Sequence, residues 1–455
     1  MTQTATRPDL TTGPFLKKII LFALPLALSS VLQLFFNAAD IVVVGRFAGS
    51  EALAAVGSNG SLINLLTNLF IGLSVGANVV AARGLGAGDR EGVHNTVHTA
   101  VLLSLLCGAV LAVAGFFSAR TLLGWMSSPE DVIDLATLYL KIYFIGMPVT
   151  MLYNFGSALL RAAGDTRRPL YCLAVAGLIN IVLNLVFVIV FHMSVAGVAL
   201  ATIISQAVSA VMVLVILMNE TGLLHLELSE LRLHRSAMLK IMQIGLPAGL
   251  QGTIFSLSNV VIQSAINSFG SVVIAGNSAA SNIEGFVYVA MNALHQACVT
   301  FTSQNMGAGK YNNIGKVLRG CQICVVVAGL SLSLGAVLCS DVLVGVYSAD
   351  PAVIAAGRQR LELICMTYVL CGVMDTMVGS LRGMGFSIMP MIVSLLGSCV
   401  FRLVWVATIF RVNPTIITLY LCYPISWLIT AAAHVVCYFI VRRKFIPAQR
   451  VKAKA

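Results

Sequence analysis

Three acids and one arginine lie inside long apolar stretches of this sequence, where a charged side chain is unfavourable. Asp40 lies in the first stretch, residues 18–49, and Glu284, Asp375 and Arg402 lie in later ones. An ionisable group inside a membrane span usually faces a partner or a water-filled cavity, and it commonly marks an ion or substrate path. These four residues are therefore the first candidates for a functional site.

Amide and hydroxyl side chains lie at the same predicted depth as Asp40. Asp40, Asn184 and Thr202 each fall about six or seven residues from the outer end of an apolar span, which is roughly 10 Å at the rise of an α-helix. Asn37 and Asn180 precede Asp40 and Asn184 by about one turn, so each helix presents a polar stripe. We expect these helices to meet there. Simple hydrogen bonding between helices is the alternative role for Asn180 and Asn184.

The elements that must position these residues are membrane-spanning helices. The chain of 455 residues is 58% hydrophobic and 10% charged, with a mean hydropathy of +0.94, which is typical of a polytopic membrane protein. Runs of about 20 apolar residues predict a span each. The twelve predicted spans are 17–45, 54–82, 93–117, 132–158, 169–191, 195–218, 238–267, 272–305, 316–339, 353–379, 387–410 and 414–441.

The distribution of basic residues predicts the orientation. With both termini in the cytoplasm, 21 of the 28 Lys and Arg residues fall on the inner side and five on the outer side, as the positive-inside rule requires. The net charge of +11 then reflects cytoplasmic loops near anionic lipid, and we expect no nucleic-acid partner.

The sequence repeats itself after about 221 residues. Gly86–Gly88 matches Gly307–Gly309, and Leu160-Arg161-x-x-Gly164 matches Leu381-Arg382-x-x-Gly385. We therefore predict an all-α integral membrane fold of twelve helices in two pseudo-twofold-related six-helix lobes. Residues 1–222 form the first lobe, residues 223–237 a cytoplasmic connector, and residues 238–455 the second lobe with a basic tail. Such repeats usually place the substrate path at their interface.

The motifs also resemble those of a known family. Phe36–Arg46 reads FNAADIVVVGR, residues 86–89 read GAGD, and residues 160–169 read LRAAGDTRRP. Together with their second-half counterparts they resemble the MATE family, the multidrug and toxic compound extrusion transporters. The resemblance implies a bacterial inner-membrane antiporter that exports cationic or amphiphilic compounds in exchange for H⁺ or Na⁺ by alternating access.

The resemblance also implies site residues. Asp40, Asn180, Asn184 and Thr202 match the proton or cation site of the first lobe. Many relatives carry a second acid where this chain has Asn184, and a hard cation prefers several charged oxygens, so H⁺ is the preferred coupling ion and Na⁺ at Asp40 or Asp375 the alternative. Burial favours the neutral carboxyl, so a proton and a cationic drug can compete for Asp40.

The second lobe and the substrate pocket give weaker expectations. We expect Asp375, Glu284 and Arg402 to form a second-lobe site, with Glu284 and Arg402 paired; a purely structural ion pair is the alternative. Side chains that suit an adaptable apolar pocket, with core or lipid packing as the alternative, are Asn37, Tyr139, Met147, Tyr153, Tyr288 and Met291.

Several other functions are unfavoured by the sequence. GAGK at residues 307–310 does not fit the phosphate-loop pattern, so we expect no ATP site. We expect no enzyme activity, no organic cofactor and a monomer. The histidines form no HExxH motif, and the Cys321-x-x-Cys324 pair has no further ligands nearby, so we expect no transition-metal site. A flippase for lipid-linked precursors is the alternative function, although it requires several basic residues in its cavity.

Overall fold

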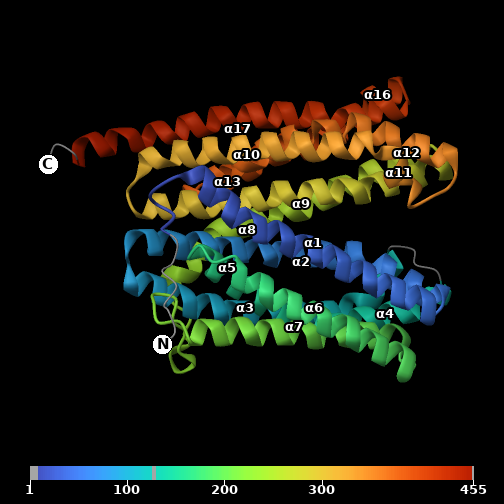
Figure 1. Ribbon diagram of the computed structural model, residues 1–455, viewed down its shortest axis with the longest axis horizontal. Coiled ribbons are helices and arrows are strands. Elements are labelled where there is room, and N and C mark those ends of the chain that lie inside the picture. The colour runs from blue at the N-terminus through green and yellow to red at the C-terminus, as the bar shows by residue number, and fades with distance from the viewer. Residues whose placement is uncertain (1–8, 126–129, 453–455) are drawn as a thin grey trace. The chain divides into compact units, whose positions relative to one another are not determined.

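The computed structural model describes residues 9–125 and 130–452, and every regular element in these ranges is helical (Figure 1). The first half contains α1 (Phe15–Phe47), α2 (Ser50–Ala87), α3 (Arg90–Trp125), α4 (Glu130–Ile145), α5 (Met147–Ala162), α6 (Arg167–Leu185), the π-helical turn η1 (Val186–Val190), α7 (Ser194–Met218) and the 3₁₀ turn η2 (Leu228–Glu230).

The second half repeats this order with more interruptions. It contains α8 (Arg235–Asn267), α9 (Ser271–Gly307), α10 (Tyr311–Leu338), α11 (Ser340–Gly345), α12 (Pro351–Leu363), the 3₁₀ turn η3 (Cys365–Thr367), α13 (Tyr368–Gly383), α14 (Ile388–Ser394), the π-helical turn η4 (Leu395–Val400), α15 (Phe401–Ala407), α16 (Ile409–Val412) and α17 (Ile416–Lys452).

The helices account for the twelve predicted spans. Nine of them, within the described residues, are long and apolar enough to cross a membrane, and α4 with α5 makes a tenth span that bends by 49°. The bend lies at Gly146, directly before Met147 and Pro148. The remaining two predicted spans coincide with α8 and α9, which are long helices but are not among these ten. The molecule is therefore a multi-pass helical membrane protein, as the sequence predicted.

The repeat is visible in the backbone. Glycines with left-handed backbone conformation recur at a spacing of 221 residues: Gly88 and Gly309 both have φ of 68°, and Gly164 and Gly385 have φ of 87° and 93°. Both members of the second pair close a helix, because the following amide N–H reaches back to the carbonyl of Leu160 or Leu381. A left-handed residue at a helix end favours glycine, which explains why the two motifs share it.

Contacts divide the chain into two compact units that differ from the two sequence halves at α1 and α8. Unit 1 contains residues 28–253, and unit 2 contains residues 10–27 together with the chain from Ile254 onward. The first part of α1 thus packs in unit 2, where the ring of Phe22 meets Phe301 edge-on at 5.5 Å. The first part of α8 packs in unit 1. Each of these two helices contributes to both units.

Candidate functional site

Asp40 lies on α1 and is hydrogen-bonded to an amide on α6. The residue is 9% exposed, and its carboxylate accepts a hydrogen bond from Nδ2 of Asn184, which is fully buried. A hydrogen bond to a charged acceptor is stronger than one between neutral groups. The negative charge of Asp40 is therefore stabilised by a dipole, and no ion pair to it is found among the described residues.

The polar contacts continue from α6 to α7. Nδ2 of Asn184 also donates to Oδ1 of Asn180 at 3.2 Å, and Nδ2 of Asn180 donates to Oγ1 of Thr202 at 3.5 Å. Thr202 in turn donates to the carbonyl oxygen of Val198, one turn earlier on α7. The structure thus brings together the four residues that the sequence grouped, in one chain from α1 through α6 to α7. We call these four residues the Asp40 chain.

A glycine allows α1 and α6 to approach each other at this place. Gly177 lies seven residues before Asn184 and therefore on the same face of α6. A Cβ atom at Gly177 would overlap the ring of Phe36 on α1. Phe36 lies four residues before Asp40, so the ring of one helix packs on the bare backbone of the other just below the acid. This contact positions Asp40 against Asn184.

Three of the four pocket candidates of unit 1 are buried. Asn37 is exposed, and Met147 is fully buried in the helix core. Tyr153 donates from its hydroxyl to the carbonyl oxygen of Pro169 at 3.2 Å. Tyr139 is 7% exposed and stacks on Tyr143. Three of these four side chains therefore fill the core of unit 1, which was the alternative to a pocket.

In unit 2, Asp375 does not join the other two predicted charges. Among the described residues, no hydrogen bond or ion pair links Asp375 to Glu284 or Arg402. Its backbone carbonyl lies 2.6 Å from Nδ1 of His295, and its side chain is partly buried. Of the two pocket candidates here, Tyr288 is 44% exposed and Met291 is fully buried.

Glu284 pairs with Arg360, and the predicted pair with Arg402 was wrong. Nε and Nη2 of Arg360 donate to the two carboxylate oxygens of Glu284 at 2.9 and 2.8 Å. Both residues are buried. Arg360 is one of the five basic residues that the predicted orientation placed on the outer side, whereas α12 begins at Pro351 and carries Arg360 into the interior of unit 2. Its place inside the predicted span 353–379 was the available signal.

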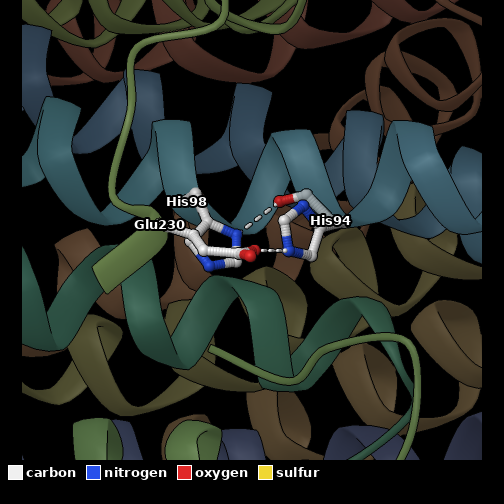
Figure 2. A group of neighbouring side chains, drawn as sticks. All are labelled: His94, His98 and Glu230. Atoms are coloured by element: carbon white, nitrogen blue, oxygen red, sulfur yellow. Dashed lines mark hydrogen bonds and ion pairs between the residues drawn. The ribbon is translucent and has the colours of Figure 1, made fainter. Parts of the chain in front are cut away.

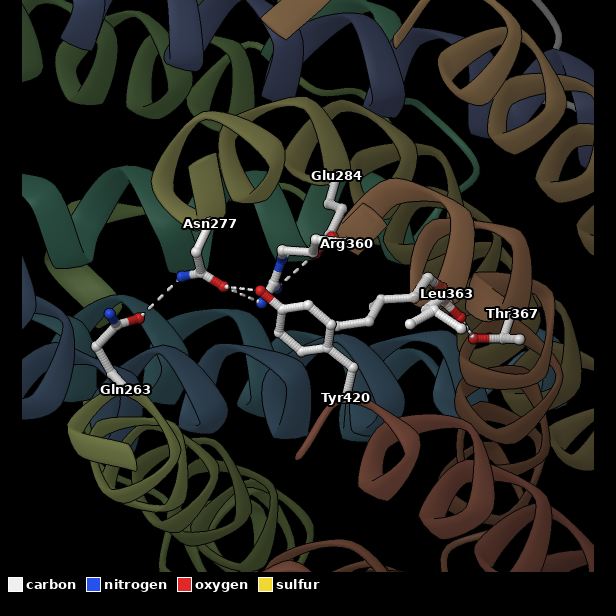
Figure 3. A network of polar contacts seen from close by, with 8 residues as sticks. Gln263, Asn277, Glu284, Arg360, Leu363, Thr367 and Tyr420 are labelled. Atoms are coloured by element: carbon white, nitrogen blue, oxygen red, sulfur yellow. Dashed lines mark hydrogen bonds and ion pairs between the residues drawn. The ribbon is translucent and has the colours of Figure 1, made fainter. Parts of the chain in front are cut away.

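A polar network surrounds this ion pair (Figure 3). Nη1 of Arg360 donates to Oδ1 of Asn277 at 2.6 Å, and the hydroxyl of Tyr420 donates to the same oxygen at 3.4 Å. Nδ2 of Asn277 donates to Oε1 of Gln263 at 3.2 Å. The network ties α9 and α12 to α8 and α17, and it supplies the charged pair with the hydrogen bonds that burial requires.

Arg402 lies among aromatic rings. Its guanidinium lies over the rings of Tyr423 and Trp427, with 4.3 and 5.5 Å to the centroids, and Nε donates to Oγ of Ser426 at 2.9 Å. The residue is 3% exposed, and its Nη2 has no hydrogen-bond partner among the described residues. Cation–π contacts stabilise this charge in place of an acid.

Comparisons with known proteins agree with this architecture. A profile described as MatE matches residues 25–186 and 247–408, which lie in the two repeats. The probable multidrug resistance protein YpnP of Bacillus subtilis is 29% identical over 394 residues, covering 87% of this chain and 88% of that protein. The FAD transporter of Shewanella oneidensis is 24% identical over 352 residues, covering 76% and 78%.

The fold is shared with a solved structure described as the outward-facing conformation of a multidrug resistance MATE family transporter of the MOP superfamily. That structure superimposes with a TM-score of 0.90 at 20% identity, and the match covers 98% of this chain and all of the other. Because the profile spans most of both repeats and the fold matches over nearly the whole chain, this protein belongs to the MATE family of multi-pass membrane transporters.

Proposed function

We propose that this protein is a secondary active efflux transporter that exchanges cationic or amphiphilic organic compounds for H⁺, with Na⁺ as the alternative ion. The observation that carries the proposal is the Asp40 chain. It has a buried carboxylate on α1 with no cation paired to it in the part of the protein that the structure describes, and its hydrogen bonds run to α6 and α7. A charge in that environment favours uptake of a proton or an organic cation.

The composition of the Asp40 chain favours H⁺ over Na⁺. It contains one carboxylate, two amides and one hydroxyl, whereas a hard metal cation prefers several charged oxygen ligands. Asn184 suits proton exchange, because its Nδ2 donates to the carboxylate of Asp40 while its Oδ1 has no hydrogen-bond partner within residues 9–125 and 130–452. A 180° turn of the amide would let that oxygen accept from the protonated acid. The same side chain can stabilise both states.

Exchange then follows from competition. The proton and the organic cation each cancel the charge of Asp40, so they do not occupy it together. Only the neutralised site tolerates the dehydrated change between inward- and outward-open states, which couples the two fluxes without ATP. The names of relatives such as the multidrug resistance protein YpnP support drug-like substrates.

The experiment is transport in proteoliposomes with separately imposed proton and sodium gradients and a panel of fluorescent cationic dyes. We expect the wild type to respond to the proton gradient and Asp40→Asn to lose that response. Asp134→Asn is the matched control, since Asp134 is exposed and pairs with Arg120 at the surface. Export by Asp40→Asn at the wild-type rate under a proton gradient would contradict proton coupling through Asp40.

We further propose that both termini lie in the cytoplasm of a bacterium. The charge bias supports this orientation, and it places the α10–α12 segment outside. Cys339 follows α10 and is the exposed cysteine of the described residues. A membrane-impermeant maleimide should therefore label intact cells at Cys339 and leave Cys339→Ser unlabelled. Labelling that requires cell lysis would indicate the opposite orientation.

An anionic substrate, such as a nucleotide or a lipid-linked pyrophosphate, is the second candidate. Arg402 favours it, because this buried cation has an unpartnered Nη2 and no acid paired with it among the described residues. The relative named FAD transporter gives the idea a precedent. Adding flavin adenine dinucleotide to the substrate panel separates the two candidates. An anionic substrate would be favoured if the wild type transports flavin adenine dinucleotide but no dye, and if Arg402→Gln loses that transport.

A further inference from the structure

Two histidines and a glutamate meet where the connector between the repeats crosses α3 (Figure 2). His94 and His98 lie one turn apart near the start of α3, and Glu230 comes from η2 in the connector. Nε2 of His94 lies 2.8 Å from Oε2 of Glu230. One ligand atom from each of the three residues lies within 4.8 Å of the other two. The two histidines are four residues apart in the sequence, and the expectation of no transition-metal site overlooked this spacing.

We propose that His94, His98 and Glu230 form a binding site for a divalent transition-metal ion, with Zn²⁺ the best match. Two imidazoles and one carboxylate are a common zinc ligand set, with water in the fourth position. Imidazole ligands favour Zn²⁺, Cu²⁺ or Ni²⁺ over Mg²⁺ and Ca²⁺. The ion would reach the site from solvent, because the side chains of His94 and Glu230 are 40% and 51% exposed.

His98 holds the inner position of the site. It is fully buried, its Nδ1 lies 2.8 Å from the carbonyl oxygen of His94, and the backbone N–H of Glu227 donates to its Nε2 at 3.1 Å. Coordination through Nε2 replaces the bond from Glu227 and leaves Nδ1–H donating to the carbonyl oxygen of His94, which orients the ring as outer hydrogen bonds do for metal-bound histidines. Metal binding is therefore coupled to the backbone of the connector.

The connector is already anchored on both sides of this site. Leu224 and Leu226 are buried in the core of unit 1. Further along, the backbone N–H of His234 donates to Oγ1 of Thr99 at 3.0 Å. Between these anchors, η2 is held to α3 by the His94–Glu230 contact, which is solvent-exposed and thus weak by itself. A metal ion would replace that contact with coordination bonds that join the connector to α3, just before α8 begins.

Zinc binding to the purified full-length transporter tests the proposal. The protein is prepared without an affinity tag, in a Cys339→Ser background, and is titrated with Zn²⁺ by calorimetry and with Co²⁺ by absorption. We expect one Zn²⁺ per chain, intense tetrahedral d–d bands with Co²⁺, and at least tenfold weaker binding in His94→Ala and in Glu230→Gln. His225→Ala is the control, because this histidine lies in the same connector but outside the cluster.

Hydrogen exchange provides a second readout that does not depend on transport. With Zn²⁺ bound, the amides of residues 222–234 should exchange at least several-fold more slowly, and this protection should vanish in Glu230→Gln, whose side chain is exposed and whose folding is checked by its melting temperature. The proposal is overturned if the wild type binds no stoichiometric Zn²⁺, or if His94→Ala and Glu230→Gln bind it as the wild type does.

Discussion

Two buried acids of this protein are stabilised in different ways. Glu284 faces the guanidinium of Arg360 in a two-pronged ion pair within the same unit, so its charge is permanently balanced. Asp40 accepts a hydrogen bond from the neutral Asn184, so its charge is not balanced by a protein cation among the described residues. Only an unbalanced acid gains from binding a mobile cation. This contrast favours Asp40 for coupling and Glu284 for stability.

The Glu284–Arg360 pair should therefore behave as a structural unit. Removing one partner, as in Glu284→Gln or Arg360→Met, leaves the other buried without its partner, and we expect the free energy of unfolding to fall by about 3–5 kcal/mol. The double variant Glu284→Met with Arg360→Met removes both charges and should recover much of that loss. Thermal unfolding in detergent measures these effects.

Arg358 provides the matched control for this prediction. It lies two residues before Arg360 on α12, and it pairs with Glu362 and Asp341 at the exposed surface. Because solvent screens such pairs, Arg358→Met should barely change the melting temperature. Equal destabilisation by Arg358→Met and Arg360→Met would show that the buried pair has no special role.

At the level of elements, the close approach of α1 to α6 depends on the absence of a side chain at Gly177. Gly177→Ala places a methyl group into the ring of Phe36, and overpacking of this kind costs about 1–3 kcal/mol. The helices must separate next to the Asp40 chain, so we expect proton-driven export to fall together with the melting temperature. Adding Phe36→Ala removes the clash and should restore part of both. A double variant as impaired as Gly177→Ala would locate the damage elsewhere.

Hydropathy predicted where helices cross the membrane, but not where they break. Each of the twelve predicted spans coincides with a helix or a broken helix, and ten of them are long and apolar enough to cross a membrane within the described residues, because burying about twenty apolar residues in lipid requires a helix. The bend at Gly146, the 3₁₀ turn Cys365–Thr367 and the π turns after Leu185 and Ser394 lie within predicted spans. Such breaks depend on packing against neighbouring helices, which the periodicity of a single segment does not record.

The residues of the candidate site were likewise predictable only in part. The Asp40 chain was predictable, because a polar residue inside an apolar helix is rare and its depth follows from counting residues. The partner of Glu284 was not, since Arg360 lies 76 positions away in the sequence, and counting residues placed Arg402, but not Arg360, at the depth of Glu284. Which arginine faces the acid depends on the rotation of each helix, and rotation is fixed by the packing of the whole unit.

At the scale of the molecule, the repeat places two helices, α1 and α8, in both units. The first part of α8 packs closely on α2 within unit 1. Gly72 and Gly76 of α2 face Gly245 and Gly249 of α8, and a Cβ atom at Gly72 or Gly76 would overlap the backbone of α8. Small residues four apart on facing helices allow such close packing in membranes.

This contact yields a prediction about exchange. In Gly76→Leu the side chain must push the first part of α8 away from α2, so the state described here is disfavoured. If alternating access requires this state, export should fall at least tenfold, and amides of residues 235–253 should exchange faster with solvent. Gly60→Leu is the control on the same helix, because nothing lies within 4 Å of a Cβ atom at Gly60. Full export by Gly76→Leu, with faster amide exchange confirmed, would mean that the turnover cycle does not depend on the close contact of α2 and α8.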